Sequence, residues 1–236
     1  MPGDERTAGP VARNVLSAQV KDRMLQWILE GELPRGSRII ETRIARQLGT
    51  SQAPVREALR DLATLGLIDV DPYRGARVRS PAADELIEAM ELRGELEAIA
   101  ARAAVAAIDE NGLARMRDLI DEMRASAELG DPHAQAIQNS RFHSCVVAAS
   151  GNRTLQRLWS MLEPFARTYL TATTPGADLH CLAERHVAIL EAFEASDPER
   201  AAAAMRTHAR EAQRQALAAT AADAASPGLV TGDVPG

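Results

Sequence analysis

Residues 51–68 read SQAPVREALRDLATLGLI, and this run predicts a short amphipathic helix entered through a tight turn. Ser51 has a hydroxyl suited to capping the first turn, and Pro54 falls where a missing N–H is tolerated. Apolar residues recur at helical spacing along one stripe, so Arg56 and Arg60 point away from the buried side. The stripe consists of Val55, Ala58, Leu59, Leu62 and Leu65.

Two more helices are predicted upstream of this run. Residues 16–29 place apolar side chains on one face and stop before Gly31, and residues 38–48 form a shorter segment that ends at Gly49. Glycine after a periodic segment is a common helix terminator, because it adopts the left-handed conformation without strain. The second and third helices therefore meet across a short turn, as in a helix-turn-helix.

The sequence changes from helical to strand-like after residue 66. LIDV at 67–70 and ARVRS at 76–80 have the composition of strands, and DPYRG at 71–75 has that of a turn. A hairpin that directly follows a helix-turn-helix forms a wing. We therefore expect a winged helix-turn-helix over residues 14–80, preceded by a disordered segment over residues 1–13.

From residue 81 onward the sequence is helical and rich in alanine, and five Gly, Pro or Asn breaks divide it. The expected fold is mainly α, with an all-α bundle of six to seven helices over residues 81–221 and a disordered tail over residues 222–236. The expected helices are 82–108, 113–128, 132–149, 153–171, 177–195 and 198–220.

Charge is distributed unevenly along the chain. The net charge is −6, yet residues 1–80 hold 13 Lys plus Arg against 10 Asp plus Glu, whereas residues 81–236 hold 14 against 23. A basic N-terminal part on an acidic remainder suits phosphate binding at one end only. No run of 18 apolar residues and no signal-peptide pattern occurs, so we expect a cytoplasmic protein without a membrane partner.

The predicted helix-turn-helix and wing carry side chains that suit double-stranded DNA. Arg56 can form a forked pair with guanine or phosphate, Gln52 can pair with adenine, and Arg74 beside Gly75 can enter a narrow groove. The alternative for any one of these side chains is an ordinary solvated surface. The expected DNA-binding residues are Arg38, Thr42, Arg43, Ser51, Gln52, Arg56, Arg60, Arg74 and Gly75, with Arg46 a further candidate for phosphate contact.

Three of the five histidines fall on inward-facing stripes of three different helices. These are His143, His186 and His208, and Asn139 lies one turn before the first of them. Burying three unpartnered imidazoles would cost about 1–3 kcal/mol each, so a shared metal ion is an attractive partner. Asn139 can add a fourth ligand through its amide oxygen. Each histidine taken alone fits a hydrogen-bonded core residue better than a metal ligand.

Three segments together resemble the GntR family of transcriptional regulators: GELPRGSRIIETRIARQLG at 31–49, SQAPVREALRDLATLGLI at 51–68 and RGARV at 74–78. The helical region resembles the FCD ligand-binding domain of the FadR branch. The resemblance implies that Arg56 contacts the operator and that the turn at Arg74 reaches the minor groove. Gln52 and Ala53 replace a commoner Arg-Thr, and Thr42 replaces an arginine of some members, so no operator sequence is transferred.

The resemblance to FCD domains also implies a divalent metal centre. In that family a D-x-x-F-H helix and two later histidines hold zinc, nickel or manganese, and NSRFH at 139–143, ERHVAIL at 184–190 and MRTHA at 205–209 match those places. Asn139 stands where aspartate is usual, which should weaken binding of a hard cation. Arg93 resembles an arginine that binds an effector carboxylate, and the alternative is a surface ion pair with Glu97.

The function expected from these features is a homodimeric regulator that binds a pseudo-palindromic operator and responds to a small organic acid. Two alternatives remain open. Three histidines and an oxygen can activate water in a metal-dependent hydrolase, although no carboxylate is placed as a general base. The helical region can also be purely structural in a DNA-binding dimer.

Overall fold

A computed structural model describes residues 11–71, 75–80, 82–173 and 177–225. The chain divides into two compact units, one of Met1–Pro81 with Ser160–Thr168 and the other of Ala82–Trp159 with Tyr169–Gly236. For the description of the elements, we call residues up to 80 the head. We call the helices from residue 82 onward the helical body, and this name includes Ser160–Thr168. Within the described residues, no helix has the length and apolar character needed to cross a lipid bilayer.

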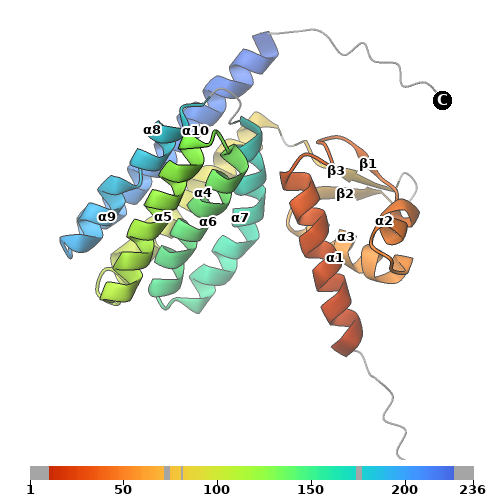
Figure 1. The fold of residues 1–236 in the computed structure, drawn as a ribbon, viewed down its shortest axis with the longest axis horizontal. Coiled ribbons are helices and arrows are strands. Elements are labelled where there is room, and N and C mark those ends of the chain that lie inside the picture. Colours follow the sequence, from red (N-terminus) through yellow and green to blue (C-terminus); the bar gives the residue numbers. More distant parts are fainter. Residues whose placement is uncertain (1–10, 72–74, 81, 174–176, 226–236) are drawn as a thin grey trace, which may run out of the picture. The chain divides into compact units, whose positions relative to one another are not determined.

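The head is a three-helix unit with a small antiparallel sheet, as predicted (Figure 1). The third helix packs against the first, the second and the strand that follows it. Its predicted apolar stripe is the reason, because Val55, Ala58 and Leu62 are completely buried. The sheet order is β1-β3-β2. The elements are α1 (Val11–Leu29), β1 (Arg38–Ile39), α2 (Glu41–Gln47), α3 (Gln52–Thr64), β2 (Ile68–Asp71) and β3 (Gly75–Val78).

Two local predictions in the head are wrong. Residues 38–48 are not one helix, because Arg38 and Ile39 form β1 and pair with β3, and α2 begins only at Glu41. The β-branched side chain of Ile39 is buried by this pairing, which outweighs the local helical pattern. Ser51 precedes α3 in an extended conformation, but its hydroxyl makes no capping hydrogen bond. Arg74 lies outside the described residues.

The described part of the helical body contains seven helices. The fourth and tenth helices of the chain pack along much of their length. Gly94 allows them to approach closely, because a Cβ atom there would lie 2.6 Å from the Cβ of Ala209. The helices are α4 (Ala83–Ala104), α5 (Glu110–Glu128), α6 (Pro132–Ala149), α7 (Arg153–Thr173), α8 (Leu179–Glu184), α9 (Val187–Glu194) and α10 (Pro198–Ala225).

The helix predicted over residues 177–195 is in fact two helices. The chain breaks between α8 and α9 at Arg185 and His186. The ring Nδ1 of His186 lies 3.1 Å from the carbonyl oxygen of Leu182 and 3.2 Å from that of Ala183. A side chain that competes for backbone carbonyls weakens the helical ladder at that point. The break places the His186 ring among the buried residues of the body.

Candidate DNA-binding surface and candidate metal centre

Every predicted DNA-binding residue that the structure describes is exposed on the head. Arg56 links α3 to α2, because its Nε lies 2.6 Å from Glu41 Oε2 and its Nη2 donates to Gln52 Oε1 at 3.0 Å. The guanidinium is thus held in place at the exposed surface. The exposed residues are Arg38, Thr42, Arg43, Arg46, Ser51, Gln52, Arg56, Arg60 and Gly75.

A second group of exposed cationic side chains lies on the sheet. Arg38 of β1 is paired with Arg77 of β3, and a Cβ at Gly75 would lie 4.0 Å from the Arg38 guanidinium. Gly75 has φ of 83°, a conformation that favours glycine at the start of the strand. Arg77 was not among the predicted residues. The alternation of a strand could have indicated it. Arg77 stands between the buried Ala76 and Val78 and so faces outward at the two-residue period.

The three predicted histidines come together inside the helical body. His143 is on α6, His186 at the start of α9 and His208 on α10, and their exposed fractions are 1%, 2% and 8%. The Nε2 atoms of His143 and His208 are 3.2 Å apart, and each of the three rings offers a nitrogen within 4.8 Å of the others. We call these three residues the histidine cluster. The expectation that they share an inward-facing site is confirmed.

The orientation of His143 is determined by a buried carboxylate. Its Nδ1 lies 2.9 Å from Glu97 Oε2, and Glu97 Oε1 accepts hydrogen bonds from Arg93 Nε and Trp159 Nε1, each at 2.7 Å. Burial alone would raise the pKa of Glu97, but the Arg93 charge and the contacts with His143 and Trp159 outweigh burial and lower it to about 2. In the neutral ring, the ionised carboxylate favours the proton on Nδ1 of His143. The lone pair on Nε2 therefore faces the cluster.

His186 is oriented in the same sense by backbone carbonyls. Burial, assisted by the nearby His143, lowers the pKa of His186 to about 3, so the ring is neutral at neutral pH. Because Nδ1 faces the carbonyl oxygens of Leu182 and Ala183, the single proton resides there. The unprotonated Nε2 lies 2.9 Å from Asn139 Oδ1. With the Asn139 amide in this orientation, its oxygen and the lone pair of His186 Nε2 face each other. Both are hydrogen-bond acceptors, and a cation beside them would stabilise this arrangement.

The donor set fits a divalent ion. Two nitrogens that each lie about 2.1 Å from a metal, at angles between a right angle and a tetrahedral one, are separated by about 3.0–3.4 Å. The separation between His143 Nε2 and His208 Nε2 is within this range. Burial also holds the pKa of His208 well below its usual value, so this ring too is a neutral donor. A buried neutral histidine oriented through its other nitrogen, as His186 is, is the usual form of a metal ligand.

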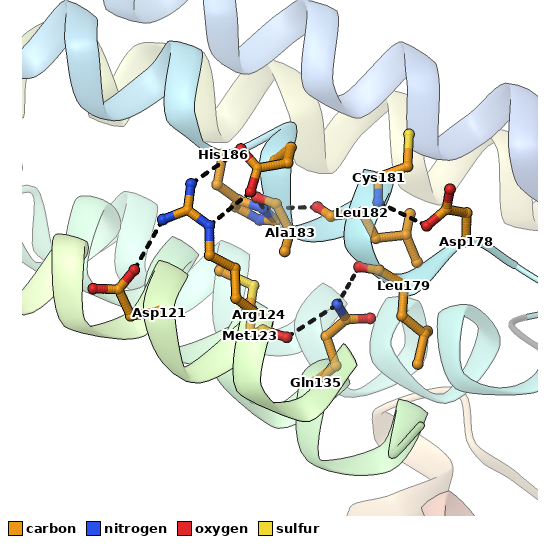
Figure 2. A network of polar contacts seen from close by, with 11 residues as sticks. Asp121, Met123, Arg124, Gln135, Asp178, Leu179, Cys181, Leu182, Ala183 and His186 are labelled. Atoms are coloured by element: carbon orange, nitrogen blue, oxygen red, sulfur yellow. Dashed lines mark hydrogen bonds and ion pairs between the residues drawn. The ribbon is translucent and has the colours of Figure 1, made fainter. Parts of the chain in front are cut away.

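The short helix α8, which supplies the carbonyls that orient His186, is fixed at both ends (Figure 2). Arg124 of α5 forms a two-pronged ion pair with Glu184, with distances of 2.6 Å from Nε to Oε1 and 3.0 Å from Nη2 to Oε2. At the other end, Gln135 of α6 donates from Nε2 to the carbonyl of Leu179 at 2.6 Å. These two contacts hold α8 against α5 and α6.

Replacing Gln135 with leucine is expected to lower the free energy of unfolding by about 1–3 kcal/mol, because the Leu179 carbonyl loses its buried donor. Urea denaturation followed by circular dichroism measures this change. Gln156→Leu is the matched control, because the Gln156 amide of α7 donates at 3.3 Å to the Ala148 carbonyl at the exposed surface, where water can replace it. This control should alter stability by less than about 0.5 kcal/mol. Equal effects of the two variants would show that Gln135 does not support α8.

Arg93 is not on the surface. The predicted ion pair with Glu97 is present, but both side chains are buried, and the Arg93 guanidinium lies 5.8 Å from the centre of the Trp159 ring. The ion pair expected at the surface therefore exists, but it is buried, and the surface location was wrong. Glu97 and Trp159 are parts of the site that were not predicted from the sequence. The role of Arg93 in effector binding stays a prediction.

Comparisons with known proteins agree with both parts of the structure. Residues 16–78 match the profile of bacterial regulatory proteins of the gntR family, and residues 88–211 match that of the FCD domain. The "Probable D-xylose utilization operon transcriptional repressor" of Paenarthrobacter nicotinovorans is 38% identical over 86% of this chain and 90% of its own length. The solved structure of Escherichia coli McbR/YncC has a TM-score of 0.75 at 27% identity, covering 89% of this chain and 98% of that one.

Proposed function

The chain belongs to the GntR family of bacterial regulators and carries an FCD domain, and from this premise we propose that it is a repressor whose operator binding responds to a small carboxylate held at the histidine cluster. The protein is a DNA-binding transcriptional regulator, and its relatives are regulators rather than enzymes. The comparisons therefore give no support to a hydrolase.

The observation that carries the effector half of this proposal is the convergence of unprotonated ring nitrogens in the buried cluster. His143 and His186 are each oriented through Nδ1, so their Nε2 lone pairs meet beside His208 and Asn139. These four side chains would hold a divalent metal such as zinc, nickel or manganese. When bound, the metal would supply Lewis acidity and open coordination positions for a carboxylate oxygen.

The DNA half of the proposal rests on the exposed residues of the head. We assign base or phosphate contacts to Gln52, Arg56 and Arg60 of α3, and phosphate contacts to Arg38 and the residues of α2. A helix-turn-helix dimer reads two half-sites related by twofold symmetry, so the operator is pseudo-palindromic. Arg74 and Gly75 would reach the adjacent minor groove.

The effector class follows from two observations. The donors of the histidine cluster are neutral, so they offset none of the charge of a divalent ion, and the Paenarthrobacter relative is named for an operon of D-xylose utilization. A small acid with hydroxyl groups, of the type formed by oxidation of a sugar, satisfies both. The carboxylate would bind at the metal, and the hydroxyl groups would find polar partners in the body.

Operator selection followed by effector titration tests the proposed function. Rounds of selection from random duplex DNA should give a pseudo-palindromic site bound in the nanomolar range at physiological salt. Sugar acids and simple carboxylates, added with zinc, should weaken this binding by about 5–150-fold, the usual range of allosteric coupling. The same acids should have no effect on His186→Ala. If no acid changes DNA affinity and a chelator has no effect either, the helical body is structural and the proposal fails.

A further inference from the structure

The ligands of the histidine cluster carry no negative charge. An imidazole that binds a metal through one ring nitrogen is a neutral ligand, and this holds for each of the three clustered histidines. The fourth donor, Asn139, is an amide and is also neutral. A divalent ion bound by these four residues would bring two positive charges into a buried site, and its ligands would neutralise neither charge.

The nearest carboxylate does not supply the missing charge. Glu97 contacts His143, but Arg93 lies 2.7 Å from the same carboxylate and balances it. A second cation, Arg185, is the sequence neighbour of His186. Arg185 is itself paired with Glu211 at 3.6 Å. Within the described residues, the charges recorded around the cluster thus cancel in pairs.

A buried, uncompensated charge is strongly destabilising, and the cost grows when the charge is doubled. Four neutral donors therefore bind a divalent ion more tightly when a negative ligand enters with it. We propose that the histidine cluster takes up a divalent cation and a small anion as a mutually dependent pair, and that the neutral Asn139 makes cation affinity depend on the anion. This inference rests on the metal centre of the proposed function and adds a rule for its occupancy.

The consequence concerns regulation. Because coupling between two ligands is reciprocal, the anion raises metal affinity by the same factor as the metal raises anion affinity. The cluster would then be filled at lower concentrations of each ligand when both are present. An aspartate at position 139 would neutralise part of the metal charge itself and weaken this dependence. With aspartate at that position, the effector would act on a helical body that already holds a metal ion.

Zinc affinity measured with and without acetate tests the inference. Competition with a chromophoric chelator gives the zinc Kd, in buffer at about pH 6.5, where zinc-bound water with a pKa near 7 stays mostly protonated. Sodium perchlorate, a weakly coordinating salt, keeps the ionic strength constant. Saturating acetate is expected to tighten zinc binding by wild type about tenfold or more. Asn139→Asp should bind zinc about tenfold tighter without acetate and lose most of the acetate effect.

Three controls separate the possible failures. Asn111→Asp makes the same change at an exposed position of α5 and should behave as wild type, whereas His186→Ala should bind no zinc. Thermal unfolding checks that each variant folds. Tight zinc binding by wild type that acetate does not change overturns the coupling and leaves the metal centre in place. Absence of zinc binding under both conditions overturns the metal centre itself. An undiminished acetate effect in Asn139→Asp overturns the role of Asn139.

Discussion

His186→Ala is expected to reduce the metal content of the purified protein from about one divalent ion per chain to nearly none. His186 is buried, and its Nε2 is unprotonated because Nδ1 faces two backbone carbonyls. Loss of one of three imidazole ligands removes most of the affinity of a site that has no anionic ligand. Elemental analysis of the protein after exposure to zinc with acetate, followed by gel filtration in the same acetate buffer, measures the content.

His180→Ala is the matched control for this experiment, because His180 belongs to α8 but is exposed. Zinc at 100 times its Kd stabilises a folded protein by about 2.7 kcal/mol, so wild type and His180→Ala should show the same rise in Tm. His186→Ala should show none. A rise in Tm and full metal content in His186→Ala would mean that the three histidines are core residues and that any ion binds elsewhere.

The periodic parts of the structure could be predicted from the sequence. The apolar residues of α3 recur at helical spacing, and their burial is expected because the helix has no other apolar face. The inward direction of the three histidines follows from the same rule. What could not be predicted is β1, since two residues form a strand only because β3, about forty positions away, pairs with them.

The partners of the histidines were beyond sequence reasoning for a different reason. Helix α4 is rich in alanine on several sides, and Ala98, Ala100 and Ala101 are all completely buried. Periodicity then gives no unique buried face, so the sequence does not indicate that Arg93 and Glu97 point inward. The contact between Glu97 and His143 joins α4 to α6 and depends on how these helices pack.

Arg56→Ala is expected to weaken binding to the selected operator by about fivefold to 150-fold, which corresponds to about 1–3 kcal/mol for a forked contact with one base. Arg56 is exposed on α3 and held by Glu41 and Gln52, so its guanidinium is oriented before DNA arrives. Fluorescence anisotropy with labelled duplexes measures both affinities. Stability should hardly change, because the ion pair that is lost is exposed.

Arg200→Ala provides the control. The Arg200 side chain is 50% exposed and that of Arg56 is 56% exposed, and Arg200 likewise pairs with a carboxylate, that of Glu191, at 2.8 Å. It lies on α10 of the body and should leave DNA affinity unchanged. An undiminished affinity of Arg56→Ala for the operator would contradict the assignment of α3 as the reading helix.

The same variant also distinguishes a base contact from a phosphate contact. If Arg56 binds a base edge, the loss is large for the operator and small for unrelated duplexes, and specificity relaxes at one position of each half-site. If it binds a phosphate, all sequences weaken together, and the dependence of log Kd on log salt falls by about one unit of slope. The contact with Gln52 favours the first result, since Arg56 and Gln52 emerge from one face of α3 and would address neighbouring positions. The operator would then be read by α3, and the sheet residues Arg38 and Arg77 would contribute affinity without sequence preference.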